Sequence, residues 1–261
     1  MSNRFHSLLR AGFSLALASS LLLAQKPKSK KEVDAINAIN AATTVDGRLA
    51  AIDNVLITFK DTEFKPMLLQ MALQLEAQKG DYAQVMSYGQ RILDSDPKNA
   101  TAMITMAAET ARRTREYDLD KEEKLSKVDK WAKDGIESAK TAPKPPGSAA
   151  SDAQWEDARK DLQAQGWEAL AMAAAVRKKS DEAIADFKQS IAVAATPDPA
   201  TWLRLGQAYE DAGKLDDAND AFDKAAASPA ATAQVKSVAA SKKAEVAKLK
   251  AGAAKPPSGS Q

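Results

Sequence analysis

The stretch Trp202–Pro229, WLRLGQAYEDAGKLDDANDAFDKAAASP, decides the fold of this chain. Trp202, Leu205 and Tyr209 stand at i, i+3 and i+7, which predicts a helix with one large apolar face. Gly206 lies on the same helix and has no side chain, so a neighbouring helix can approach closely there. The first half of the stretch is therefore expected to be an amphipathic helix suited to close packing.

The second half of the stretch predicts a turn and a return helix. Gly213 follows the last periodic residue, at a position where helix ends favour a left-handed glycine. Ala218 and Phe222 stand at i and i+4, so a small and a large side chain share one face of the second helix. Pro229 then ends this helix. A turn this short makes the two helices antiparallel neighbours.

The spacing W-x2-L-G-x2-Y, A-x3-F and P resembles that of the tetratricopeptide repeat (TPR). This resemblance implies an all-α, right-handed superhelical solenoid of antiparallel helix pairs with a C-terminal capping helix. It also implies a scaffold whose first helices line a concave groove for a peptide or helix of a partner protein. Repeats of this family bind other molecules and are not by themselves enzymes, so we expect no catalytic activity and no cofactor.

Weaker copies of the pattern precede the quoted stretch. Trp167 and Phe187 lie 35 residues before Trp202 and Phe222. Two earlier copies begin near Leu68 and, 35 residues later, near Met103. In the second of these, the return helix is displaced by 43 residues rather than 35, which places an insertion of eight residues in the turn around 114–123. We expect about four repeats in all.

These patterns divide the chain into consecutive segments. Pro143, Pro145 and Pro146 interrupt the helical pattern between the second and third repeats. The predicted segments are a signal peptide (1–24), a disordered basic leader (25–31), an N-terminal helical pair serving as a degenerate repeat or cap (32–62), two TPR-like repeats (64–140), a Pro-rich loop or linker (141–151), a helical extension with two TPR repeats (152–230), a capping helix (231–251) and a disordered tail (252–261).

The first segment has the pattern of a secretory signal. Arg4 and Arg10 precede an apolar run of 14 residues, Ala11–Ala24, which is shorter than the roughly 20 residues that a membrane-spanning helix needs. We place the cleavage after Ala24, although Ala18 is an alternative site. The resemblance and the signal together predict a bacterial periplasmic or secreted protein, with membrane contact only through an uncleaved signal or the basic tail.

The composition excludes several kinds of chemistry. The chain has no cysteine, and its only histidine is His6, inside the predicted signal. A mature chain without these residues has no Ser-His or Cys-His catalysis and none of the common zinc sites. Removal of residues 1–24 leaves 35 basic and 35 acidic residues. This balance gives no general attraction to nucleic acid. With the resemblance and the absence of Cys and His, it leads us to expect a protein or peptide partner, no nucleic acid and no metal.

The resemblance also assigns side chains to the concave groove. One subset of the family binds a peptide's terminal carboxylate with Lys, Arg and Asn in the groove, and the assigned positions here hold none of these residues. The sequence therefore predicts an apolar groove with an acidic edge, although the apolar members are equally consistent with core packing. The assigned residues are Leu69, Leu73, Glu76, Ile104, Ala108, Ala111, Glu168, Met172, Ala175, Leu203, Gln207 and Glu210.

Two other functions remain open from the sequence. Glu76, Glu168 and Glu210 are the carboxylates that a glycan-active enzyme on a helical scaffold would use, provided that two of them face each other across a cleft. The Lys-rich C-terminal segment would suit a lipid or nucleic-acid binder, although lysines on a terminal helix more commonly serve solubility.

The insertion contributes two further candidate sites. Arg112, Arg113 and Arg115 form a basic cluster that suits a phosphopeptide, or simply a solvated helix end where cations are favoured. Asp118 and Asp120 begin a calcium-loop-like acidic run, but the central glycine and the final glutamate of that motif are missing. We therefore expect a solvated turn without a bound ion.

Overall fold

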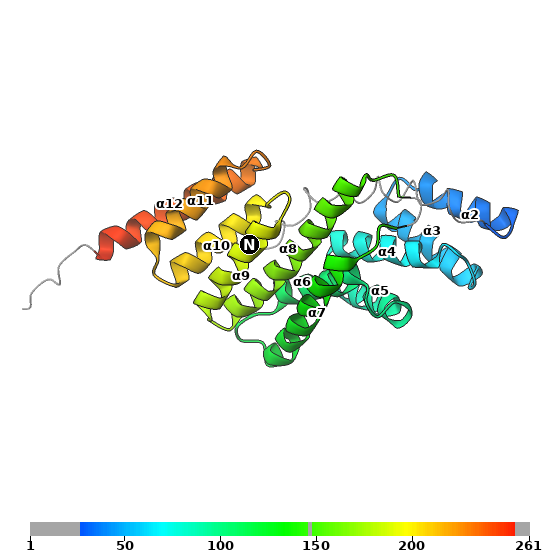
Figure 1. Ribbon diagram of the computed structural model, residues 1–261, viewed down its shortest axis with the longest axis horizontal. Helices are drawn as coiled ribbons and strands as arrows, with labels where there is room; N and C mark the ends of the chain where they lie inside the picture. The colour runs from blue at the N-terminus through cyan, green and yellow to red at the C-terminus, as the bar shows by residue number, and fades with distance from the viewer. Residues whose placement is uncertain (1–26, 146–147, 254–261) are drawn as a thin grey trace, which may run out of the picture.

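The computed structural model describes residues 27–145 and 148–253, and these residues form helices and no strand (Figure 1). The helices follow one another along an extended array from α2 at one end to α12 at the other. The predicted signal peptide, the first two residues of the leader, residues 146–147 of the linker and residues 254–261 of the tail lie outside the described residues. No helix in the described ranges combines the length and apolarity needed to cross a membrane.

The eleven helices of the described residues form five pairs and one terminal helix. Each pair consists of a first and a return helix joined by a short connection. The bounds are α2 Lys30–Ala41 and α3 Val45–Thr58; α4 Lys65–Lys79 and α5 Tyr82–Ser95; α6 Ala100–Arg113 and α7 Lys121–Thr141; α8 Asp152–Val176 and α9 Ser180–Val193; α10 Pro199–Asp211 and α11 Leu215–Ala227; and finally α12 Ala233–Ala253.

The helices stack so that each pair covers the apolar face of the next. α8 packs on both helices of the preceding pair, α6 and α7, and α10 packs on α9. The buried side chains form successive clusters rather than one central core, as expected for a solenoid. The prediction of an all-α helical solenoid is confirmed.

Close helix contact occurs where the sequence places glycine. A Cβ atom on Gly206 would lie 2.7 Å from Cδ1 of Phe222, so the ring of α11 rests directly on the backbone of α10. Gly80 and Gly213 have left-handed backbones, with φ of 75° and 71°, at the turns after α4 and α10. Lys178 occupies the corresponding turn after α8 with φ of 62°, a conformation that costs a side-chain-bearing residue energy.

The connection between α7 and α8 is anchored to both helices. The indole Nε1 of Trp155 donates to the Ala142 carbonyl at 3.0 Å, and Arg159 donates to the Lys140 carbonyl at 2.9 Å. Lys144 pairs with Asp152 at 2.7 Å. The predicted extension and the first helix of the next repeat form one helix of 25 residues, α8. Its N-terminal half lies over the preceding repeat, where Leu162 contacts Ile104 and Ala139.

The terminal helix α12 covers the end of the array. Ala239 and Val246 are buried against Phe222 and Ala218 of α11. Lys243 pairs with Asp223, Lys250 pairs with Asp216, and Lys242 lies 3.5 Å from Glu210. Three lysines of the predicted basic cap therefore hold α12 in place.

Candidate functional site

A pocket of about 370 Å³ opens where α6, α8 and α10, the first helices of three consecutive pairs, converge. Its apolar floor comes from small or flexible side chains of these helices and from the buried Phe187 of α9. The loop between α6 and α7 forms one wall. The lining residues are Ala111, Arg112, Thr114, Arg115, Glu116, Met172, Ala175, Val176, Lys178, Phe187, Arg204, Gln207, Ala208 and Asp211.

The pocket exists because two positions of the repeat carry alanine in the middle of the array. Ala111 lies 35 residues after Glu76, and Ala175 lies 35 residues before Glu210, so all four occupy equivalent positions. In the outer repeats, the glutamate side chains fill this position and are mostly buried. The methyl groups of Ala111 and Ala175 leave space instead, and both line the pocket.

One lining residue, Arg204, belongs to a charged pair that joins two first helices. Arg204 of α10 donates to the carboxylate of Glu168 on α8 at 2.5 Å. Glu168 is 3% exposed, whereas the side chain of Arg204 is 28% exposed. A buried carboxylate requires such a partner, since an isolated buried charge is strongly unfavourable. The pair thus fixes the guanidinium group of Arg204 at the pocket surface.

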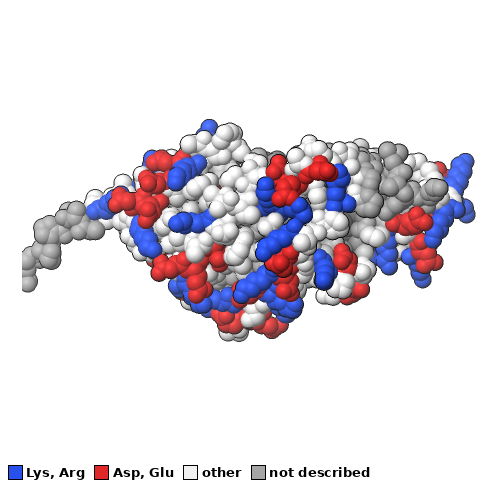
Figure 2. Space-filling model, viewed as in Figure 1, with Lys and Arg blue, Asp and Glu red and all other residues white. Residues whose placement is uncertain are grey.

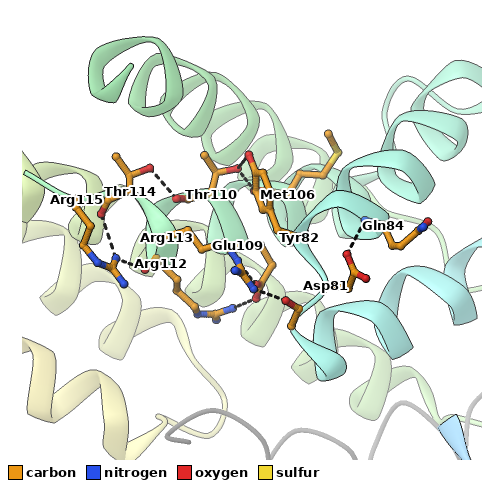
Figure 3. Close-up of polar contacts among 11 residues, drawn as sticks. Asp81, Tyr82, Gln84, Met106, Glu109, Thr110, Arg112, Arg113, Thr114 and Arg115 are labelled. Atoms are coloured by element: carbon orange, nitrogen blue, oxygen red, sulfur yellow. Dashed lines mark hydrogen bonds and ion pairs between the residues drawn. The ribbon is translucent and has the colours of Figure 1, made fainter. Parts of the chain in front are cut away.

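The three arginines at the end of α6 mostly bind other groups of the same chain (Figure 3). Arg113 donates to the Gly80 carbonyl and lies over the ring of Tyr82, with 5.6 Å between its Cζ atom and the ring centroid. Arg112 pairs with Glu109. Arg115 donates to the carbonyl groups of Arg112 at 2.6 Å and Thr114 at 3.3 Å, which satisfies acceptors at the end of the helix. Arg112 and Arg115 nevertheless also line the pocket.

The acidic run of the insertion is held by cations of the chain. Asp118 accepts hydrogen bonds from the Arg115 amide at 3.0 Å and from Lys124 at 3.4 Å. These contacts, with the backbone hydrogen bond foremost, lower the pKa of Asp118. Asp120 pairs with Lys124 at 2.8 Å. No cluster suited to a metal ion occurs among the described residues.

At the rim of the pocket, a salt bridge joins the turn after α8 to the loop between α6 and α7. Lys178 Nζ lies 3.0 Å from Glu116 Oε2 of the α6–α7 loop, and this contact is the main reason that the pKa of Lys178 is raised. The preceding Arg177 contacts Glu122 at 3.0 Å and Asp129 at 3.0 Å on α7. Two consecutive cations of one turn therefore bind the insertion and the helix that follows it.

The structure separates the predicted groove residues other than Glu76 and Glu168 into three sets. Leu69, Leu73, Ile104 and Ala108 are buried between helices, so they pack in the core and offer no surface to a partner. Leu203 packs against the apolar cluster shared by α11 and α12, and Glu210 lies 3.5 Å from Lys242 of α12, the helix that covers this end of the array. Met172 and Gln207 line the pocket, together with Ala111 and Ala175.

The prediction that the groove lacks cationic side chains does not describe this pocket. Arg112, Arg115, Lys178 and Arg204 all line it. The assignment of groove positions by the repeat pattern passed over Arg204 because it lies one residue beyond Leu203. The unusual position of Lys178 could have been found from the sequence. It stands 35 residues before Gly213 and so occupies a turn position that favours glycine.

The three carboxylates nominated for an enzyme lie apart from the pocket lining, each beside its own cation. Glu76 lies 3.5 Å from Lys79, Glu168 pairs with Arg204 and Glu210 lies 3.5 Å from Lys242. Burial raises the pKa values of Glu76 and Glu210. None of these three glutamates is among the residues that line the pocket.

No protein-family model and no curated protein sequence matches this chain. Among solved structures, the chain is similar to TTC0263, a thermophilic TPR protein from Thermus thermophilus, with a TM-score of 0.56 and 16% identity over 80% of this chain and 97% of that one. The chain therefore has a TPR-like fold.

Two further solved structures align with lower scores. The assembly chaperone of RpL4, Acl4, has a TM-score of 0.41 and 10% identity over 87% of this chain and 99% of that one. The TPR2AB domain of yeast Sti1, in a complex with pHSP90, has a TM-score of 0.28 and 16% identity over 86% of this chain and 98% of that one.

Proposed function

We propose that this chain is a non-catalytic protein-interaction scaffold of the bacterial cell envelope, which binds a peptide or helix of a partner protein in the pocket between α6, α8 and α10. The pocket itself is the observation that carries the proposal. It combines an apolar floor with polar groups at its edge, as ligand sites generally do. Three successive first helices line it, so a bound segment would contact three repeats at once.

The size of the pocket suits one or two side chains of a partner. A volume of about 370 Å³ lies near the lower end of the range for small-molecule sites, roughly 300–1,000 Å³. Met172 and Ala175 provide the apolar contact, and Met is a side chain that adapts to different partners. Interactions of this kind place one or two anchoring side chains in a pocket and the rest of the segment along the surface.

Site-specific photo-cross-linking in living cells tests this function. A photoreactive amino acid at Met172 should capture a defined protein, because this side chain is half-buried in the pocket. The control replaces Gln189, which is exposed on α9 outside the pocket lining. The proposal requires a species that appears at position 172 and not at 189; identical products at the two positions, or none at 172, would contradict it.

The envelope location rests on the pattern of residues 1–24 and has its own test. The protein recovered from the envelope fraction should begin at Gln25, the residue after the predicted cleavage site. Amino-terminal sequencing of that protein reads this directly. Recovery of the chain from the cytosol with its first residues intact would contradict the proposed location while leaving the proposed binding function untouched.

A further inference from the structure

The loop between α6 and α7, residues 114–120, is held in place by its own polar contacts. The Thr114 hydroxyl donates to the Thr110 carbonyl at 2.8 Å, and the Arg115 amide donates to Asp118 at 3.0 Å. Lys178, from the turn after α8, pairs with Glu116 at 3.0 Å. We call residues 114–120 the insertion loop. Its backbone is preorganised, so a partner would lose little of its binding free energy in ordering this loop.

This ordered loop presents two large apolar side chains to solvent. Tyr117 is 88% exposed and Leu119 is fully exposed. Side chains in these positions bury almost no area on folding, so they contribute little hydrophobic stabilisation to the fold. Tyrosine is also among the residues that most often carry binding energy at protein interfaces.

The insertion loop is continuous with the proposed binding pocket. Thr114, Arg115 and Glu116 form part of the pocket lining. The next residue, Tyr117, directly follows Glu116, whose carboxylate pairs with Lys178 at the rim. A segment bound in the pocket that extends past this rim would therefore reach Tyr117 and then Leu119.

Arg115 differs from the other cations of the pocket lining because its guanidinium group makes no ion pair with another described residue, although its backbone amide donates to Asp118. The other cations of the lining contact carboxylates, namely Glu109 for Arg112, Glu116 for Lys178 and Glu168 for Arg204. The guanidinium group of Arg115 donates to two backbone carbonyls, and within the described ranges no ion pair joins it to a carboxylate. The exposed surface beside the pocket thus has a cation whose charge a partner's carboxylate would complement.

We propose that Arg115, Tyr117 and Leu119 extend the binding site and select an acidic amphipathic segment of the partner protein. One apolar side chain of that segment occupies the pocket, a second packs against Tyr117 and Leu119, and a carboxylate contacts Arg115. This inference rests on the proposed function, because it describes the partner of the same site.

Selection from a library of random 12-residue peptides displayed on phage tests this inference on the chain 25–261, which contains every described residue. Selected peptides should pair Asp or Glu with large apolar residues. Synthetic peptides of the selected sequences should bind at least about tenfold more weakly to the double variant Tyr117→Ser, Leu119→Ser and to Arg115→Glu, as expected when anchoring residues are lost. Ile57→Ser is the matched control, because Ile57 is 71% exposed on α3, and it should change affinity less than about twofold.

The outcomes separate this inference from the function on which it rests. If Ala175→Leu in the pocket abolishes peptide binding but the loop variants do not affect it, the insertion loop is not part of the site. Selection of basic peptides would likewise overturn the inference, as would a dimer in light scattering that the loop variants dissociate, since the occupant would then be a second copy. Failure to select any peptide would contradict the proposed function as well. Circular dichroism of each variant confirms that its helical content is unchanged.

Discussion

At the scale of single residues, Gly206 shows how the fold depends on close approach. An added methyl group at this position would lie 2.7 Å from Cδ1 of the Phe222 ring, which is buried and cannot move away freely. We expect Gly206→Ala to lower the free energy of unfolding by about 1–3 kcal/mol, the usual cost of overpacking. Urea titration measures this loss. Gly252→Ala is the control, because a Cβ atom there meets nothing within 4 Å, and its effect should stay within about 0.5 kcal/mol.

Two of the left-handed turn positions, Gly213 and Lys178, allow the cost of this backbone conformation to be measured by substitutions in opposite directions. Gly213→Lys should destabilise the protein by about 1 kcal/mol, since the site has φ of 71° and open space around it, so that only the backbone conformation is penalised. Lys178→Gly should stabilise it by the same relief of backbone strain, less the contribution of the Glu116 contact. Thermal unfolding of both variants provides the comparison, and a shift in the same direction for both would refute the strain at Lys178.

Glu76 permits a test by pH. Burial is the main cause of its raised pKa and outweighs the attraction of Lys79. A carboxyl group with a raised pKa binds protons more tightly in the folded state, so its contribution to stability decreases as pH rises from its unfolded value through its folded value. Glu76→Gln should therefore increase the free energy of unfolding at pH 7, and this advantage should shrink as pH falls below the folded pKa. An advantage that grows on acidification would contradict this account.

At the scale of helices, α12 is the element whose role is most readily tested. Ala218 and Phe222 are buried partly because α12 covers them, and the half-buried Leu203 and Tyr209 belong to the same cluster. A chain that ends at Pro229 lacks this cover, so we expect it to self-associate and to unfold at a lower temperature, as solenoids do without a cap. Light scattering and thermal unfolding report the two effects. A chain that ends at Ala253 retains α12 and should behave like the full chain.

Helices with strong periodicity could be predicted from the sequence. The repeat spacing did not predict which of their side chains line the pocket and which are buried between helices. The stretch from Trp202 to Phe222 fixed the register by which the weaker repeats were found. The same register placed Leu69 and Ile104 in a groove, yet both are buried. A residue of a first helix faces either the groove or the adjacent helices. The superhelical twist between repeats decides between the two, and the repeat spacing does not specify this twist.

The charged wall of the pocket was the least predictable feature for a different reason. Arg204 and Glu168 are 36 residues apart and become partners only when α8 and α10 are stacked. The insertion was located correctly from the change in spacing between the second pair and the third, but its length did not indicate that its residues would form a wall of the pocket. Loop conformation is determined by contacts such as Lys178–Glu116 that arise from distant parts of the chain.

At the scale of the whole molecule, the array has uncharged surface among interspersed charges of both signs on the face shown in Figure 2. A net charge near zero for the predicted mature chain and this mixed surface give no broad electrostatic attraction to a polyanion. Specific binding is therefore expected to depend on local fit at the pocket. Its position between three successive pairs means that a partner bound there would also hold those pairs in one relative arrangement.

The most direct test of the proposed function is to fill the pocket and measure binding of the cross-linked partner. Ala175→Leu introduces apolar volume at the position where the outer repeats carry Glu76 and Glu210, and Ala185→Leu introduces the same volume on the exposed side of α9. We predict that the purified partner binds Ala175→Leu at least about tenfold more weakly than the unmodified chain and binds Ala185→Leu with unchanged affinity. Equal affinity for both variants would contradict the assignment of this pocket as the binding site.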